Sequence, residues 1–114
     1  MKSYTDIEQS KKLAEILSIE SADGYWDFQI DGYKLIADEL GYYKNDSEIP
    51  CWSLAALLEI IPWGQVNRMT NSNKWEASSW TNSNFVSEFY VEGYDNPIDA
   101  CYAMIIKLHE QKLL

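Results

Sequence analysis

Apolar residues recur at helical spacing over the last part of the chain, and this is its clearest hydrophobic pattern. They share an arc of roughly 120° on a helical wheel and are Ile98, Cys101, Tyr102, Ile105 and Leu108. Asn96 is a favourable N-cap, because its side-chain oxygen can accept a backbone N–H, and Pro97 is tolerated at the first helical position. The pattern predicts a helix from Asn96 to Leu114. The residues predicted to face away from the core are Ala100, Ala103, Lys107 and Glu110.

Two shorter segments show the same spacing and predict two more helices. The first begins at Thr5, which forms a capping box with Glu8, and runs to about Leu17. The second follows Ser53, the predicted N-cap, and is ended by Pro62. Its apolar positions are Leu54, Leu57, Leu58 and Ile61, and the apolar side chain just before it is Trp52. These positions predict a central helix that is covered on most of its circumference.

Five segments are predicted to be strands, and apolar and polar residues alternate most clearly in the first and the last of them. The segments are Tyr25–Ile30, Tyr33–Ile36, Gln65–Met69, Lys74–Ser79 and Phe85–Glu92. The first two are joined by Asp31-Gly32, a favoured two-residue hairpin turn. In the last segment the apolar residues alternate with acidic ones, which indicates an antiparallel sheet with one buried face.

Together these elements predict an α+β fold in a single domain, residues 1–114. Three helices are expected to pack on one face of an antiparallel sheet of three to five strands. The sequence leaves open whether the first hairpin joins the later strands in one sheet.

Charge restricts the function. The net charge is −9, from 18 acidic residues against 9 basic ones, so the surface repels phosphate and anionic lipid. We expect no direct nucleic-acid binding and no membrane binding. Between Glu20 and Glu48 there are eight acidic residues against two lysines. That segment is either a solvated face or a docking face for a basic protein partner, with Asp23, Asp27 and Asp31 as candidate binding residues.

The three aspartates are spaced by four residues, which on a helix would place them together and suggest a metal site. On the predicted strands, however, successive members lie roughly 13 Å apart. The alternating ligands of a calcium loop are absent from this stretch. The sequence therefore predicts neither a metal ion nor a cofactor.

The two cysteines and the histidine are not predicted to form a catalytic site. Cys51 and Cys101 lack a CxxC partner and are expected to be small buried side chains, although a disulfide between them stays open. His109, within the apolar arc of the last helix, is expected to be half-buried at the edge of the core. With no signal peptide and no apolar run of membrane-spanning length, the chain is predicted to be cytoplasmic.

Three functional hypotheses follow. The first is a small non-enzymatic interaction protein, accessory or inhibitory, that uses its acidic or aromatic surface. The second is a ligand-binding module in which Trp75, Trp80 and Tyr90 form an aromatic platform. The third is a carboxylate-based hydrolase with Glu76 facing Glu88 across neighbouring strands. A homodimer is an open alternative, because exposed aromatic residues on a small sheet often mark an interface.

Two blocks of the chain, Ile49–Leu58 and Asn96–Glu110, together with Ile7–Ala14 and Ser21–Asp23, resemble short uncharacterised proteins of Bacteroidetes genomes, phages and mobile elements. The similarity covers the predicted helices, so it implies a shared fold in a bacterial or phage cytoplasm. It implies no activity and no site residues.

Overall fold

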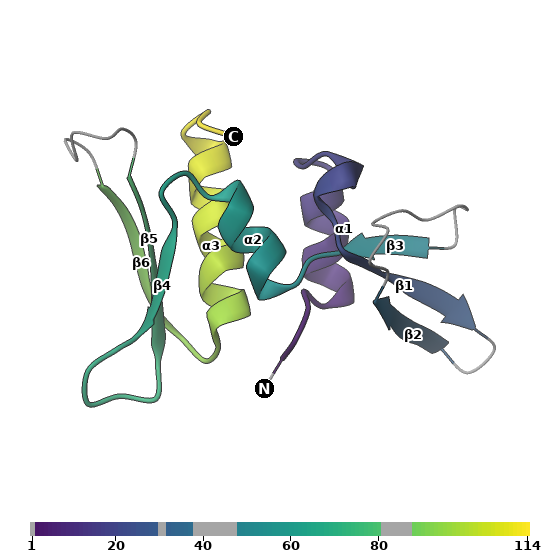
Figure 1. Ribbon diagram of the computed structural model, residues 1–114, viewed down its shortest axis with the longest axis horizontal. Helices are drawn as coiled ribbons and strands as arrows, with labels where there is room; N and C mark the ends of the chain where they lie inside the picture. Colours follow the sequence, from purple (N-terminus) through teal and green to yellow (C-terminus); the bar gives the residue numbers. More distant parts are fainter. Residues whose placement is uncertain (1, 30–31, 38–47, 81–87) are drawn as a thin grey trace.

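The computed structural model describes residues 2–29, 32–37, 48–80 and 88–114 (Figure 1). Its α-helices are α1 (Ile7–Ala14), α2 (Leu54–Ile60) and α3 (Pro97–Glu110), and a short 3-10 helix covers Ile19–Ser21. Its strands are β1 (Gly24–Gln29), β2 (Gly32–Ala37), β3 (Glu48–Cys51), β4 (Gln65–Arg68), β5 (Trp75–Trp80) and β6 (Glu88–Tyr94). The predicted α+β class is confirmed.

The six described strands form two antiparallel sheets, ordered β2-β1-β3 and β4-β5-β6. Figure 1 shows the sheets at opposite ends of an elongated molecule, 48 × 31 × 23 Å, with the three helices between them. The first hairpin therefore does not join the later strands. The helices are also divided: α1 packs near β3, whereas α3 packs against the second sheet and α2.

In the first sheet the predicted hairpin is confirmed, but its turn is displaced by one residue. Gln29 pairs with Gly32, so Gly32 belongs to β2, where its φ of 115° suits glycine. Asp31 lies outside the described residues. Strand β3 was not predicted, because a proline at position 50 breaks the usual strand signal; proline is tolerated here because β3 is an edge strand.

In the second sheet all three predicted strands are confirmed within one or two residues, while residues 85–87 of the last one lie outside the described chain. The pairing of β5 with β6 shifts between Trp75 and Ala77, where two residues of β6 oppose one of β5. Gly93 occupies this bulge with φ 87°, a conformation in which a side chain would be strained. Val91 and Phe89 pack against the core on the face turned toward α3.

Helix α3 supplies six of the fourteen buried hydrophobic residues in the described part of the chain. Asn96 caps it as predicted, its side-chain oxygen accepting the Asp99 N–H at 2.9 Å. The helix ends at Glu110, short of the predicted Leu114. The predicted outward position of Ala100 is wrong, because its side chain is fully buried. Its buried residues are Pro97, Ile98, Ala100, Cys101, Met104, Ile105 and Leu108.

Helix α1 begins one residue later than predicted. Asp6 is the N-cap and Gln9 completes the capping box, in place of Thr5 and Glu8. Thr5 is instead fully buried: its hydroxyl lies 2.8 Å from the Ser10 hydroxyl and accepts the backbone N–H of residue 52 at 3.1 Å. The threonine is thus recruited by a distant segment, a tertiary effect that overrides the local capping signal.

The N-terminal segment is bound to α3 through hydrogen bonds to Asp99. One oxygen of this carboxylate accepts from Lys2 Nζ and Gln9 Nε2, both at 2.8 Å, and the other accepts from Asn96 Nδ2 at 2.8 Å. Burial disfavours the charged form, but the hydrogen bonds from Lys2, Gln9 and Asn96 outweigh it and lower the pKa of Asp99 from 3.8.

This lowered pKa predicts a loss of stability in acid. A carboxyl whose pKa is lower in the folded state stabilises the fold above its unfolded pKa, and that contribution disappears as pH falls from about 4 downward. Urea unfolding of the wild type and of Asp99→Asn should therefore differ most near neutral pH and converge as the pH falls through the lowered pKa of Asp99. A constant difference across the whole range would show that the Asp99 charge is not coupled to folding.

Candidate interaction surface

Asp23 is a structural residue and not a free docking carboxylate. Its Oδ1 accepts the Ser53 backbone N–H at 2.8 Å, and its Oδ2 accepts a short hydrogen bond from the Ser53 hydroxyl. That hydroxyl in turn caps α2 by accepting the Ala56 N–H at 3.2 Å. The carboxylate therefore joins the start of β1 to the start of α2, and this role was missed because the two segments lie 30 residues apart.

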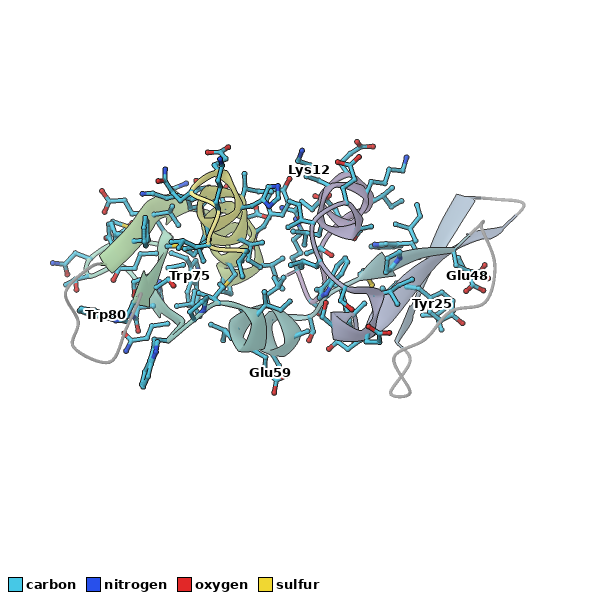
Figure 2. All side chains as sticks on the ribbon, turned by 90° about the horizontal axis from the view of Figure 1, so that it is seen from above. Lys12, Tyr25, Glu48, Glu59, Trp75 and Trp80 are labelled. Carbon is cyan, nitrogen blue, oxygen red and sulfur yellow. The ribbon has the colours of Figure 1, made fainter. Side chains whose placement is uncertain are left out.

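The rest of the predicted acidic group is only partly described. Asp27 is half-buried in the middle of β1, opposite Glu48 on one side and Lys34 on the other in the strand register. Figure 2 labels Tyr25 and Glu48 on this sheet, at the opposite end of the molecule from Trp75 and Trp80. Asp31 lies outside the described residues. The predicted triad of aspartates thus does not act as one surface, since Asp23 serves the fold.

Of the aromatic residues predicted as one platform, Trp75 and Tyr90 lie on opposite faces of the second sheet. Trp75 packs against the buried core, on the side of the sheet toward α3 (Figure 2). Tyr90 alternates with two core-facing residues of β6, so its side chain lies on the opposite face, where it is 40% exposed. Trp80 lies at the end of β5, and its backbone N–H donates to the carbonyl oxygen of Pro62 at 3.3 Å.

Tyr90 lies between two carboxylates. Its hydroxyl shares its single proton between Glu76, in a short hydrogen bond, and Glu92, at 2.9 Å. These hydrogen bonds raise the pKa of Tyr90, so it stays neutral and donates. The predicted pairing of Glu76 with Glu88 is wrong, because Glu88 pairs with Trp80 four residues along β5.

The most unusual surface residue, Trp63, was not predicted from the sequence. It lies in the turn between α2 and β4 with φ 51°, and its side chain is 58% exposed. Gly64 N–H donates to Ile61 O at 3.0 Å, which closes a turn whose third position requires a positive φ, normally supplied by glycine or asparagine. The next residue, Gly64, has no room for a side chain, because an added Cβ would lie 2.8 Å from the Ile61 side chain.

A small apolar hollow of about 130 Å³ lies beside this turn, lined by Pro62, Ser79, Trp80, Leu108 and Leu113. The Ser79 hydroxyl donates to Pro62 O at 2.7 Å, which anchors the turn on the end of β5. Leu113 is 45% exposed at the rim. We refer to Pro62, Trp63, Trp80 and Leu113 as the Trp63 patch. The sequence Pro62-Trp63-Gly64 indicated only the end of a helix, since no local pattern shows that a tryptophan will occupy a left-handed position.

The two thiols are inert in the folded protein. Cys51 and Cys101 are both free and both fully buried, and burial raises the pKa of each to about 12. A thiol in this state is neither a good nucleophile nor a good metal ligand at neutral pH.

We predict that a maleimide reagent labels neither cysteine in native protein at pH 7 and both in urea. The rate of labelling should rise with the population of unfolded chains. Labelling of folded protein at the rate of a free thiol would contradict the burial of both cysteines.

The predicted half-buried position of His109 is wrong. The ring is exposed, and its Nδ1 lies 3.1 Å from Leu114 O.

Within the described ranges, no group of three or more histidine, cysteine or acidic residues is arranged to hold a metal ion. Among the described helices, none has the length and apolar character required to cross a membrane. Comparisons with known protein families, with curated proteins and with solved structures gave no match. The resemblance to proteins of Bacteroidetes and their mobile elements stays a prediction.

Proposed function

We propose that this protein is a small, acidic, non-enzymatic interaction protein that contacts a partner protein through the Trp63 patch. The observation that carries the proposal is the exposed Trp63 side chain on a left-handed backbone. A bulky residue at positive φ costs on the order of 1 kcal/mol or more, and such conformations persist where function requires them. Glycine or asparagine would form the same turn with less strain, so the turn itself does not explain the indole.

Tryptophan is also the residue that contributes most to binding energy at protein interfaces. In the Trp63 patch it directly follows Pro62, which lines the apolar hollow together with the exposed Leu113. This arrangement provides an aromatic anchor next to a cavity that a partner's side chain can fill. The net charge of −9 favours a partner with a basic surface, because opposite charges raise the association rate.

A small-molecule site at the Trp63 patch is less well supported. The hollow there, of about 130 Å³, is smaller than the pockets of roughly 300 Å³ or more that hold small organic ligands. Trp75, one of the three aromatic residues predicted as a platform, lies on the opposite face of the sheet from Tyr90. A hydrolase is also less well supported, since Glu76 and Glu92 share an exposed tyrosine hydroxyl.

The test is affinity capture from a bacterial lysate with three baits: the wild type, Trp63→Asn, and Ile19→Ser as a matched control. Asparagine tolerates positive φ, so Trp63→Asn should keep the turn and leave stability unchanged or slightly higher. Ile19 is 46% exposed and lies in the 3-10 helix that precedes the first sheet.

We expect a protein that is captured by the wild type and by Ile19→Ser but not by Trp63→Asn. Removing an interface tryptophan should weaken the purified complex by about 2 kcal/mol or more, roughly 30-fold in Kd. Capture that is equal for all three baits would refute the role of the Trp63 patch.

A further inference from the structure

The free edge of the second sheet lies next to an apolar groove on α3. Strand β6 is at the edge of its sheet in the described chain. The groove has a volume of about 560 Å³, and its lining residues are Val91, Tyr94, Tyr102, Ala103, Ile106, Lys107, Glu110 and Gln111. An extended segment lying along β6 would contact this groove with every second side chain.

The hydrogen-bond register shows which backbone groups face the open edge. Met69 N–H donates to Lys74 O at 2.8 Å and closes the β4–β5 hairpin. Along an antiparallel ladder, residue pairs that exchange backbone hydrogen bonds alternate with pairs that do not. Even-numbered residues of β5 therefore form backbone hydrogen bonds with β4, and odd-numbered residues form them with β6. The odd-numbered residues pair with Phe89 and Val91. Tyr90, between these two, therefore turns its N–H and C=O away from β5.

The outward carbonyl of Tyr90 is covered by a lysine. Lys107 Nζ, from α3, donates to Tyr90 O at 2.9 Å. Lysine at a sheet edge is a common protection against unwanted strand pairing. Here the ammonium occupies the position that the N–H of an added strand would take, so Lys107 competes with any such strand.

The side chains at this edge select the partner. Tyr90, Glu92 and Glu76 gather on the face of the sheet turned away from α3, and the opposite side is the apolar groove. A strand that alternates basic and apolar residues matches both faces. A second copy of this chain matches poorly, because β6 paired with itself would bring acidic side chains together.

We infer that β6 accepts an extended segment of a partner protein as an added strand, with basic side chains beside Glu76 and Glu92 and apolar side chains in the groove on α3. This inference rests on the proposed function and assigns the partner a second, chemically defined contact. Binding replaces the Lys107 hydrogen bond with backbone hydrogen bonds to Tyr90.

The experiment measures binding of a blocked peptide of alternating lysine and valine by fluorescence anisotropy at moderate salt. A peptide of alternating glutamate and valine controls for charge. A lysine–valine peptide N-methylated at alternate residues controls for backbone hydrogen bonding. Tyr90→Pro removes an edge-facing N–H while leaving the β5 ladder intact, and Arg68→Pro does the same at the opposite edge, on β4.

We expect the lysine–valine peptide to bind the wild type and Arg68→Pro. Tyr90→Pro and N-methylation should each weaken binding about tenfold or more. Lys107→Met should strengthen binding several-fold, because it uncovers the Tyr90 carbonyl and removes a positive charge. Thermal melts show whether each proline variant is folded, and Lys107→Met tests the inference independently of them.

Equal binding by Tyr90→Pro and Arg68→Pro, both folded, would overturn the inference and indicate unspecific attraction to an acidic surface. So would weaker binding by Lys107→Met. A wild-type dimer that Tyr90→Pro converts to monomer would show that the edge is occupied by a second copy, which also overturns it. Capture that depends on Trp63, together with no peptide binding, would reject this inference and leave the proposed function standing.

Discussion

Trp52→Ala should lower the free energy of unfolding by about 3–5 kcal/mol, because it removes the largest fully buried side chain described. Trp52 lies immediately before α2, and its indole N–H donates to the Ser21 hydroxyl at 2.9 Å. The substitution leaves a large cavity and removes the hydrogen bond from the indole, while the Ser21 hydroxyl keeps its bond to Ser18 O. Since domains of this size are typically stable by about 5–15 kcal/mol, a large part of the total stability is at risk.

The matched control is Trp63→Ala, the same substitution at a tryptophan that is 58% exposed. Its effect on stability should be within about 1 kcal/mol of zero, because little apolar surface returns to water and alanine keeps part of the backbone strain. Urea titrations followed by circular dichroism would compare the two. Similar unfolding midpoints for both variants would contradict the buried position of Trp52.

Asp23→Ala should lower the free energy of unfolding by about 2–3 kcal/mol. The substitution leaves the backbone N–H and the hydroxyl of Ser53 without their shared acceptor in a partly buried site. It also removes a negative charge from the N-terminal end of α2. Asp23→Asn keeps one acceptor oxygen and should cost less than alanine.

Asp27→Ala is the control for this prediction, because it removes the same charge from the same strand. Asp27 pairs with Glu48 in the register, so removing its charge should change stability by less than about 0.5 kcal/mol. The same urea titration decides. Equal losses for Asp23→Ala and Asp27→Ala would show that net charge, and not the bond to Ser53, determines the effect.

Local signals predicted the elements whose capping and packing are local. Asn96 and Pro97 define the start of α3 in adjacent residues, and Ser53 does the same for α2. The beginning of α1 was displaced because Thr5 and Asp6 are both good caps. The choice between them depends on the hydrogen bond of Thr5 to residue 52, which no local window contains.

The candidate site was harder to predict than the fold. The exposure of Trp63 depends on a backbone angle, and a tryptophan gives no sign that it will adopt a positive φ. The first sheet is completed by β3, whose four residues include a proline. The role of Asp23 depends on this strand, because β3 brings Ser53 beside the start of β1. The errors on β3 and on Asp23 arose from contacts between residues far apart in sequence.

The two-sheet arrangement also has a consequence for the order of folding. Within each sheet the paired strands are close in the chain, so each sheet can form early from contacts of short range. The contact between the N-terminal segment and α3 is different, because Lys2 and Asp99 are 97 residues apart and α3 is the last helix in the sequence. We therefore expect docking of α3 to be the late step that makes the two sheets one cooperative unit.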